Sequence, residues 1–131
     1  MSTTTFHQEI SPQFFGDPIK VSITYPSTPP SPSARNKVPI TVFLSKTGGN
    51  TPLGAYVYSV YDFKKNHQVY TTTLNSSNED TLDFTIRLSK LLSTRFQCPS
   101  YVSASGLISL EESTAYIKQV MDLIKEKYDI K

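Results

Sequence analysis

The spacing of the apolar residues changes once along this chain, close to Ser76. Before this point hydrophobic side chains alternate with polar ones, which is typical of strands with one buried face. After it they recur every three or four residues in two segments, and a short strand-like stretch lies between these. The pattern predicts an α+β fold, in which two helices pack on an antiparallel β-sheet meander, as a single domain over residues 1–131.

The first half of the chain contains several segments with strand-like alternation. They are Thr5–Ile10, Lys20–Tyr25, Val38–Ser45, Gly54–Tyr61 and Gln68–Leu74. We expect Val38–Ser45 and Gly54–Tyr61 to form a hairpin, because the Gly-containing stretch Thr47–Pro52 between them is typical of a turn. The Pro-rich segment at about 26–37 is predicted to be an extended loop, since proline rings carry no backbone N–H group for a sheet.

Both helical segments begin with a capping-box pattern, Ser76–Glu79 in the first and Ser109–Glu112 in the second. Pro99 is expected to close the first helix, after which Ser100–Ser105 reads as a short strand. The expected apolar face of the first helix is Leu82, Ile86, Leu88, Leu91, Leu92 and Phe96. That of the last helix is Ile117, Val120, Met121, Ile124 and Tyr128.

Composition argues against several classes of protein. A net charge of +2 is too small to favour binding to nucleic acid. No run of apolar residues is long enough to span a membrane. A single cysteine, Cys98, excludes an internal disulfide, and two histidines, His7 and His67, are too few for a common structural zinc site. We therefore expect a cytoplasmic protein, also present in the nucleus, that needs no metal or cofactor.

The candidates for catalysis are weak, and we expect no enzyme activity. Activation of the Cys98 thiol needs a nearby base or a cationic environment, and the two histidines lie far from it in the sequence. Lys46–Gly49 has the residues of a phosphate-binding loop in the wrong order. The acids Glu79, Asp80 and Asp83 gather at a helix start, where they complement the helix dipole without any acid–base role.

The strand Gly54–Tyr61 is aromatic on both faces, which is unusual for a strand that exposes one face to water. In one interpretation, the helices cover one face of this strand, and the tyrosine hydroxyl groups lie at the boundary with solvent. In the other interpretation, a second protein covers the other face. The partner-binding candidates from this strand are Tyr56, Tyr58 and Val60.

The sequence at the end of the first predicted helix is similar to that of a known protein family. Arg95–Val102 reads Arg-Phe-x-x-Pro-x-Tyr-Val, followed by Ser105 and Leu107 at matching offsets. The pattern is similar to that of the fungal proteasome assembly chaperone 4, and the resemblance covers roughly Leu82–Tyr128. In physical terms, Phe96 and Tyr101 are expected to cap the core on both sides of the turn.

This resemblance implies a small α+β protein without enzymatic activity. Such a protein forms a heterodimer with proteasome assembly chaperone 3, and the pair binds the α5 subunit to promote assembly of the 20S α-ring. The Arg95 side chain could interact with a neighbouring group of this chain or contact a partner protein. It is therefore added to the partner-binding candidates. The alternative is a stand-alone protein-binding module of profilin-like or trafficking-adaptor type.

Overall fold

The structure is a computed structural model of the chain. It describes residues 3–10, 19–27, 38–46, 53–62, 69–77, 79–106, 108 and 110–128. The strands are β1 (Thr3–Ile10), β2 (Ile19–Pro26), β3 (Ile40–Lys46), β4 (Leu53–Tyr61), β5 (Val69–Ser76) and β6 (Ser100–Ser105), and the helices are α1 (Glu79–Phe96) and α2 (Leu110–Lys127).

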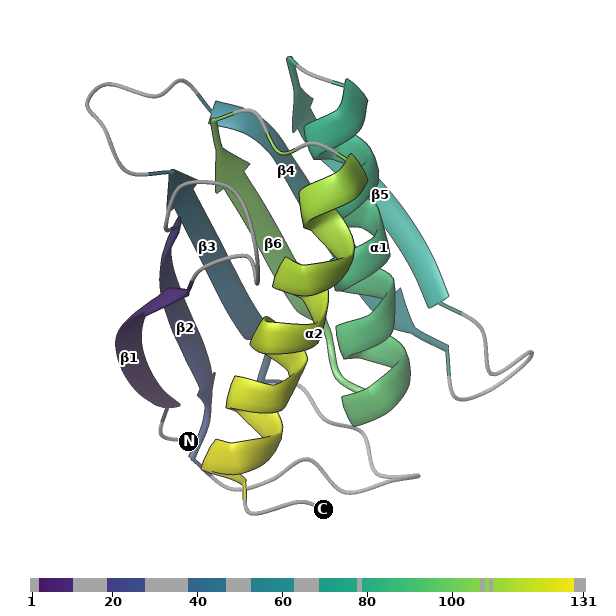
Figure 1. Ribbon diagram of the computed structural model, residues 1–131. Coiled ribbons are helices and arrows are strands. Elements are labelled where there is room, and N and C mark those ends of the chain that lie inside the picture. The colour runs from purple at the N-terminus through teal and green to yellow at the C-terminus, as the bar shows by residue number, and fades with distance from the viewer. Residues whose placement is uncertain are drawn as a thin grey trace.

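The described strands form one six-stranded sheet in the order β1-β2-β3-β6-β4-β5 (Figure 1). Strands β3 and β6 are parallel, and every other neighbouring pair is antiparallel. The parallel pair follows from the connection, because α1 carries the chain from one edge of the sheet back to its middle before β6 begins. The predicted α+β fold is confirmed.

Both helices lie on the same side of the sheet (Figure 1). On this inner face every second side chain of the central strands is buried against them, because successive residues of a strand point to opposite faces. The buried strand residues include Val21, Ile23, Ile40, Val42, Leu44, Ala55, Val57, Val102 and Ala104. The core therefore lies between the sheet and the helices.

Helix α1 buries a face that is partly polar. Of the predicted apolar residues, Leu88, Leu92 and Phe96 are buried, whereas Leu91 is 45% exposed. Phe84 was not predicted and is fully buried. The rest of the buried face is Thr81, Thr85, Ser89 and Ser93, so small hydroxyl side chains separate α1 from the sheet. The residue after the last residue of α1 is Gln97. Its φ of 51° is the left-handed conformation that terminates many helices.

The prediction for the last helix is confirmed. All five residues of its expected apolar stripe are buried, and Tyr128 follows directly after the helix. Tyr116 is not among these five residues, yet it is fully buried, and its ring meets Phe84 of α1 edge-on, with the ring centroids 6.4 Å apart. No described helix is long and apolar enough to cross a membrane.

Three local predictions need correction. The hairpin of β3 and β4 is wrong, because β6 lies between them and pairs with both. The capping box Ser76–Glu79 is also wrong: Ser76 still belongs to β5, and Glu79 is already helical. Finally, Pro26 is the last residue of β2 and not part of the loop.

Other predictions fall outside the described residues. These are the remainder of the Pro-rich loop from residue 28 to 37, the turn at 47–52, the second cap at Ser109 and the side chain of His67.

Candidate partner-binding surface

The face of the sheet that carries neither described helix is the candidate site, and we call it the open face. It consists of the outward-pointing side chains of β3, β6, β4 and β5. These are Thr41, Phe43, Ser45, Tyr101, Ser103, Tyr56, Tyr58, Val60, Tyr70 and Thr72. They alternate along the strands with the buried residues of the inner face, and each is half-buried or exposed.

Strand pairing brings three tyrosines together at the centre of the open face. Tyr58 of β4 lies directly opposite Tyr101 of β6, and their ring centroids are 4.5 Å apart with the planes tilted by 34°. The ring of Tyr56 is 6.1 Å from that of Tyr101. Aromatic side chains fixed in this way present a large apolar area at a small cost in side-chain entropy.

Two exposed aromatic residues extend this cluster on its two flanks. Phe43 on β3 is 40% exposed, and Tyr70 on β5 is 53% exposed. Phe43 lies opposite Ser103 of β6, while Tyr70 lies opposite Val60 of β4. Aromatic side chains therefore occur on all four adjacent strands of the open face, an arrangement that fits a protein partner better than a small ligand.

The pKa of the Tyr58 phenol is raised above its usual value, first because the group is partly buried and second because Tyr101 lies beside it. The hydroxyl group thus stays neutral at physiological pH. It can donate or accept a hydrogen bond to a partner without bringing a charge into an interface.

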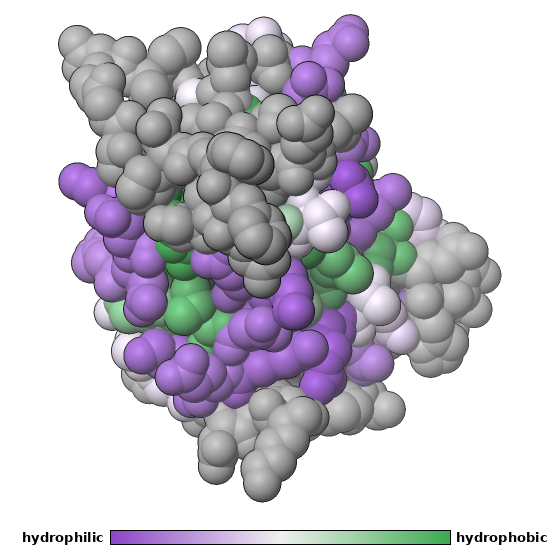
Figure 2. Space-filling view, in the orientation of Figure 1, coloured by the Kyte–Doolittle hydropathy of each residue, from purple (hydrophilic) through white to green (hydrophobic). Residues whose placement is uncertain are grey.

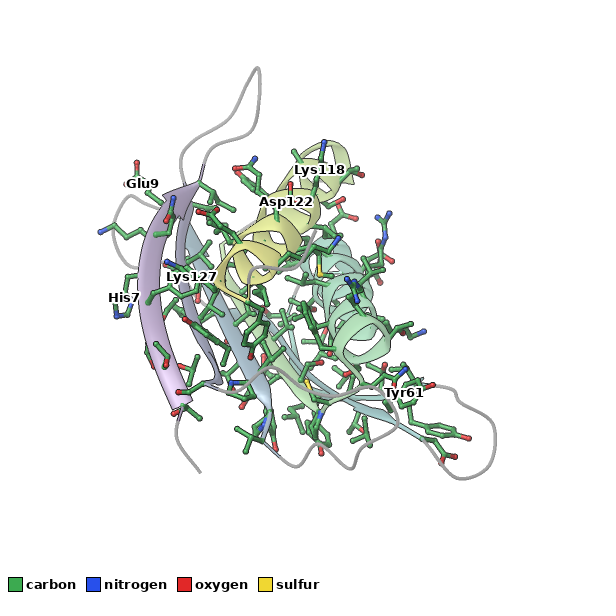
Figure 3. All side chains as sticks on the ribbon, turned by 90° about the horizontal axis from the view of Figure 1, so that it is seen from below. His7, Glu9, Tyr61, Lys118, Asp122 and Lys127 are labelled. Atoms are coloured by element: carbon green, nitrogen blue, oxygen red, sulfur yellow. The ribbon has the colours of Figure 1, made fainter. Side chains whose placement is uncertain are left out.

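None of the open-face side chains is charged. On the same side of the sheet, His7 and Glu9 of β1 are charged or titratable, and Glu9 lies opposite Lys20 in the pairing of β1 with β2 (Figure 3). Within the described part of the chain, no three His, Cys, Asp or Glu side chains gather in a way that could hold a metal ion. The chemistry of the open face is that of a protein interface.

The helical side differs in character. Its described atoms are mostly hydrophilic, with small apolar areas between them (Figure 2). This surface of the helical layer is that of a face exposed to water.

The structure brings three of the four predicted site residues together. Tyr56, Tyr58 and Val60 share the open face, whereas Arg95 lies at the end of α1, in the helical layer. The guanidinium carbon of Arg95 is 5.8 Å from the ring centroid of Phe96, a local cation–π contact. A role for any of these residues in binding stays a prediction.

Cys98 is buried between α1 and β6, and burial raises the pKa of its thiol to about 12. A thiol with such a pKa holds its proton at neutral pH, which makes it a poor nucleophile. The geometry therefore supplies no activated cysteine.

Sequence reasoning missed Phe43, Tyr70 and Tyr101 as members of this surface. Tyr101 was expected to cap the core, but it points to the open face, because its neighbours Ser100 and Val102 are the inward residues of β6. The alternation of β6 alone could have shown that Tyr101 and Val102 lie on opposite faces.

The chain is thus an α+β protein with both described helices on one face of the sheet and an uncharged aromatic surface of β3–β6 on the other. The model of the family "proteasome assembly chaperone 4" matches residues 35–105, more than half of the chain. The chain belongs to this family of proteasome assembly chaperones. The resemblance stated from Arg95–Val102 is confirmed, and the match reaches further towards the N-terminus than the residues that suggested it.

A solved structure shares the fold. It is described as the crystal structure of a novel chaperone complex for yeast 20S proteasome assembly. The likeness covers 98% of this chain and 99% of that chain, with a TM-score of 0.77 and 24% sequence identity. No curated protein matches the sequence significantly.

Proposed function

We propose that this proteasome assembly chaperone acts as one subunit of a heterodimer with a related chaperone, proteasome assembly chaperone 3. The open face is the surface through which it binds that subunit. The observation that carries this proposal is the close contact of the Tyr58 and Tyr101 rings at the centre of the uncharged open face. Burying such a face against a second sheet would remove its aromatic area from water without the cost of desolvating a charge.

The heterodimer binds the α5 subunit of the proteasome and promotes assembly of the 20S α-ring. It acts by binding, without catalysis or a cofactor, in the cytoplasm and also in the nucleus. Support for a purely binding role comes from the buried thiol of Cys98 and from the absence of a metal-ligand cluster among the described residues. The mechanism is differential affinity, since a chaperone that stabilises an early arrangement of subunits favours it over the alternatives.

The test of the interface is Tyr58→Glu, which places a carboxylate at the centre of the open face. Its control is Leu91→Glu, because Leu91 is a large apolar residue, 45% exposed, that lies in the helical layer. We expect Tyr58→Glu to weaken binding to the chaperone partner by at least about a hundredfold, as burying an unpaired charge costs several kcal/mol. Leu91→Glu should bind as the natural chain does.

The measurement is a tagged pull-down from native cytosol with mass spectrometry of the copurifying chains, together with titration of the purified partner. Circular dichroism of each variant shows that it is folded. If folded Tyr58→Glu binds the partner with unchanged affinity, the open face is not the interface. A stable monomer that brings down no proteasome subunit would support the profilin-like or adaptor alternative instead.

A further inference from the structure

Four fully buried serines form a connected cluster between α1 and the sheet. We call Ser59, Ser89, Ser93 and Ser100 the serine cluster. The hydroxyl group of Ser89 donates to that of Ser59 at 2.6 Å and lies 2.9 Å from that of Ser100. The Oγ atom of Ser93 lies 2.9 Å from the same Ser100 oxygen, and Ser59 Oγ lies 3.0 Å from Oγ1 of Thr71 in β5. Hydroxyl groups thus connect α1 to three adjacent strands.

The two strand serines of the cluster are sequence neighbours of the central tyrosines of the open face. Ser59 follows Tyr58 in β4, and Ser100 precedes Tyr101 in β6. In the pairing of these strands, Ser59 lies opposite Ser100 and Tyr58 lies opposite Tyr101. Because successive residues of a strand point to opposite faces, the serine pair lies on the inner face directly behind the tyrosine pair. Hydrogen bonds that hold β4 and β6 at the serines therefore also hold the two rings relative to each other.

Stability alone does not require hydroxyl groups at this place. Replacing both partners of a buried hydrogen bond by apolar groups of the same shape can be nearly neutral for the free energy of unfolding. Hydrogen bonds depend on direction as well as distance, which apolar contacts do so only weakly. A connected set of them therefore constrains how the helix and the strands lie against one another.

We infer that the serine cluster positions Tyr58 and Tyr101 for partner binding. Its serines are positioning residues, because they lie behind the sheet and act through the two rings, whose centroids are 4.5 Å apart. An interface that is ordered before binding loses less side-chain entropy on association and so binds more tightly. The inference rests on the proposed function, since it requires the open face to be the binding surface.

The decisive variant is Ser89→Ala, because Ser89 provides the hydroxyl group that joins Ser59 to Ser100. After this change Ser59 keeps its contact with Thr71, and Ser100 keeps its contact with Ser93 and its bond to the backbone carbonyl oxygen of residue 89. No hydroxyl group of the cluster loses its last partner, so the variant is expected to fold. The double variant Ser89→Ala/Ser93→Ala removes both helix hydroxyl groups and should have a larger effect in the same direction.

Titration of the purified chaperone partner measures the effect on binding. We expect Ser89→Ala to weaken the affinity by about fivefold or more, with circular dichroism showing that the variant is folded. The matched control is Thr85→Val, which removes a fully buried hydroxyl group from the same helix and keeps the shape of the side chain. The Thr85 hydroxyl group bonds within α1, to the carbonyl oxygens of Thr81 and Leu82, so its loss should leave the affinity unchanged.

NMR spectroscopy of the free chain reports the positions of the rings directly. An aromatic ring shifts the resonances of protons that lie close to it, so the ring protons of Tyr58 report where Tyr101 lies. Ser89→Ala should move these resonances, and Thr85→Val should not. A purely structural role of the cluster would lower the free energy of unfolding and leave the resonances in place.

The inference requires both the affinity and the resonances to change in folded Ser89→Ala. If either stays as in the natural chain, the cluster does not act through the two tyrosines. Normal binding by Ser89→Ala beside weakened binding by Tyr58→Glu would overturn this inference and leave the proposed function standing. Normal binding by Tyr58→Glu would instead overturn the proposed function and this inference with it.

Discussion

The phenol hydroxyl of Tyr128 donates a hydrogen bond of 2.7 Å to the backbone carbonyl oxygen of Pro26, the last residue of β2. The same ring meets Tyr25 and Phe96 edge-on, with centroid distances of 5.3 and 5.9 Å. One side chain thus ties the end of α2 to the sheet and to the end of α1. Lys127 adds a contact to β1 through the ring of Phe6 (Figure 3).

We predict that Tyr128→Phe lowers the free energy of unfolding by about 1–2 kcal/mol. The substitution keeps the ring contacts but leaves the buried carbonyl oxygen of Pro26 without its donor. Denaturant unfolding measures the change, with Tyr56→Phe on the open face as the control that should be near neutral. Equal stability of Tyr128→Phe and the natural chain would mean that the hydrogen bond contributes nothing.

Stability should decrease at alkaline pH because of Cys98. Burial raises the pKa of its thiol from the usual 9.0 to about 12 in the folded chain. The unfolded chain therefore loses this proton first, so the stabilisation is complete below about pH 9 and declines as the pH rises towards 12. The slope from this group rises through pH 9 and approaches about 1.4 kcal/mol per pH unit between the two pKa values.

The buried phenol of Tyr128 acts in the same direction at higher pH, since burial also raises its pKa. The measurement is therefore made between about pH 8 and 10, and the contribution of Cys98 is taken as the difference between the natural chain and Cys98→Ala, since tyrosines begin to titrate in the same interval. Cys98→Ala should unfold with a flatter pH dependence over this interval. An unchanged slope in Cys98→Ala would assign the alkaline loss to other groups.

Gly54→Ala should destabilise the chain by about 1–3 kcal/mol, because a methyl group at this position overpacks the site. An added Cβ atom would lie 2.7 Å from the Cγ2 atom of Thr81, and 3.1 and 3.2 Å from the carbonyl oxygens of Gly106 and Ala104. Thermal or denaturant unfolding measures the loss.

Thr81→Ser is the matched second change, since it removes Cγ2 and keeps the hydroxyl group that donates to the carbonyl oxygen of Gly106. The double variant should recover part of the stability lost in Gly54→Ala. A purely additive double variant would show that the backbone carbonyl oxygens, rather than Thr81, cause the strain.

Ser100→Ala should cost about 1–3 kcal/mol, more than an exposed serine would. Its hydroxyl group donates to the carbonyl oxygen of Ser89 at 3.0 Å and lies 2.9 Å from the hydroxyl oxygens of both Ser89 and Ser93. All of these groups are buried between α1 and the sheet. Ser103→Ala, on the open face of the same strand, is the control and should change the stability little.

The elements of this fold could be predicted from sequence because their signals are local. The alternation of apolar and polar residues in β2 and the apolar stripe of α2 each identify a buried face without information from elsewhere in the chain. Both predicted faces are buried in the structure. The end of α1 at Pro99 was also predicted. The left-handed Gln97 was not, because that position usually favours glycine, and nothing in the surrounding sequence indicates a glutamine there.

The order of the strands could not be predicted, because pairing depends on contacts between distant segments. The sequence places Val38–Ser45 next to Gly54–Tyr61, and a hairpin is the usual outcome for such neighbours. The burial of the serines of α1 could not be predicted from the hydrophobicity pattern either. Serine is polar, so this pattern places Ser89 and Ser93 on the solvent-facing side of the helix.

The candidate site was predicted in part for the same reason. Tyr56, Tyr58 and Val60 belong to one strand, so a period of two is enough to place them on one face. Tyr101 reaches them only because β6 lies beside β4. Phe43 and Tyr70 join through strands on the two flanks, and their membership depends on the complete sheet.

The central place of β6 also has a consequence for how the chain emerges from the ribosome. Strands β1 to β5 are synthesised first, yet β3 and β4 meet only through β6, which begins at Ser100. A nascent chain that has not reached this strand holds two separate pieces of sheet with unpaired apolar edges. Its core closes only once β6 and α2 have been synthesised, so the apolar faces of the earlier strands stay open until then.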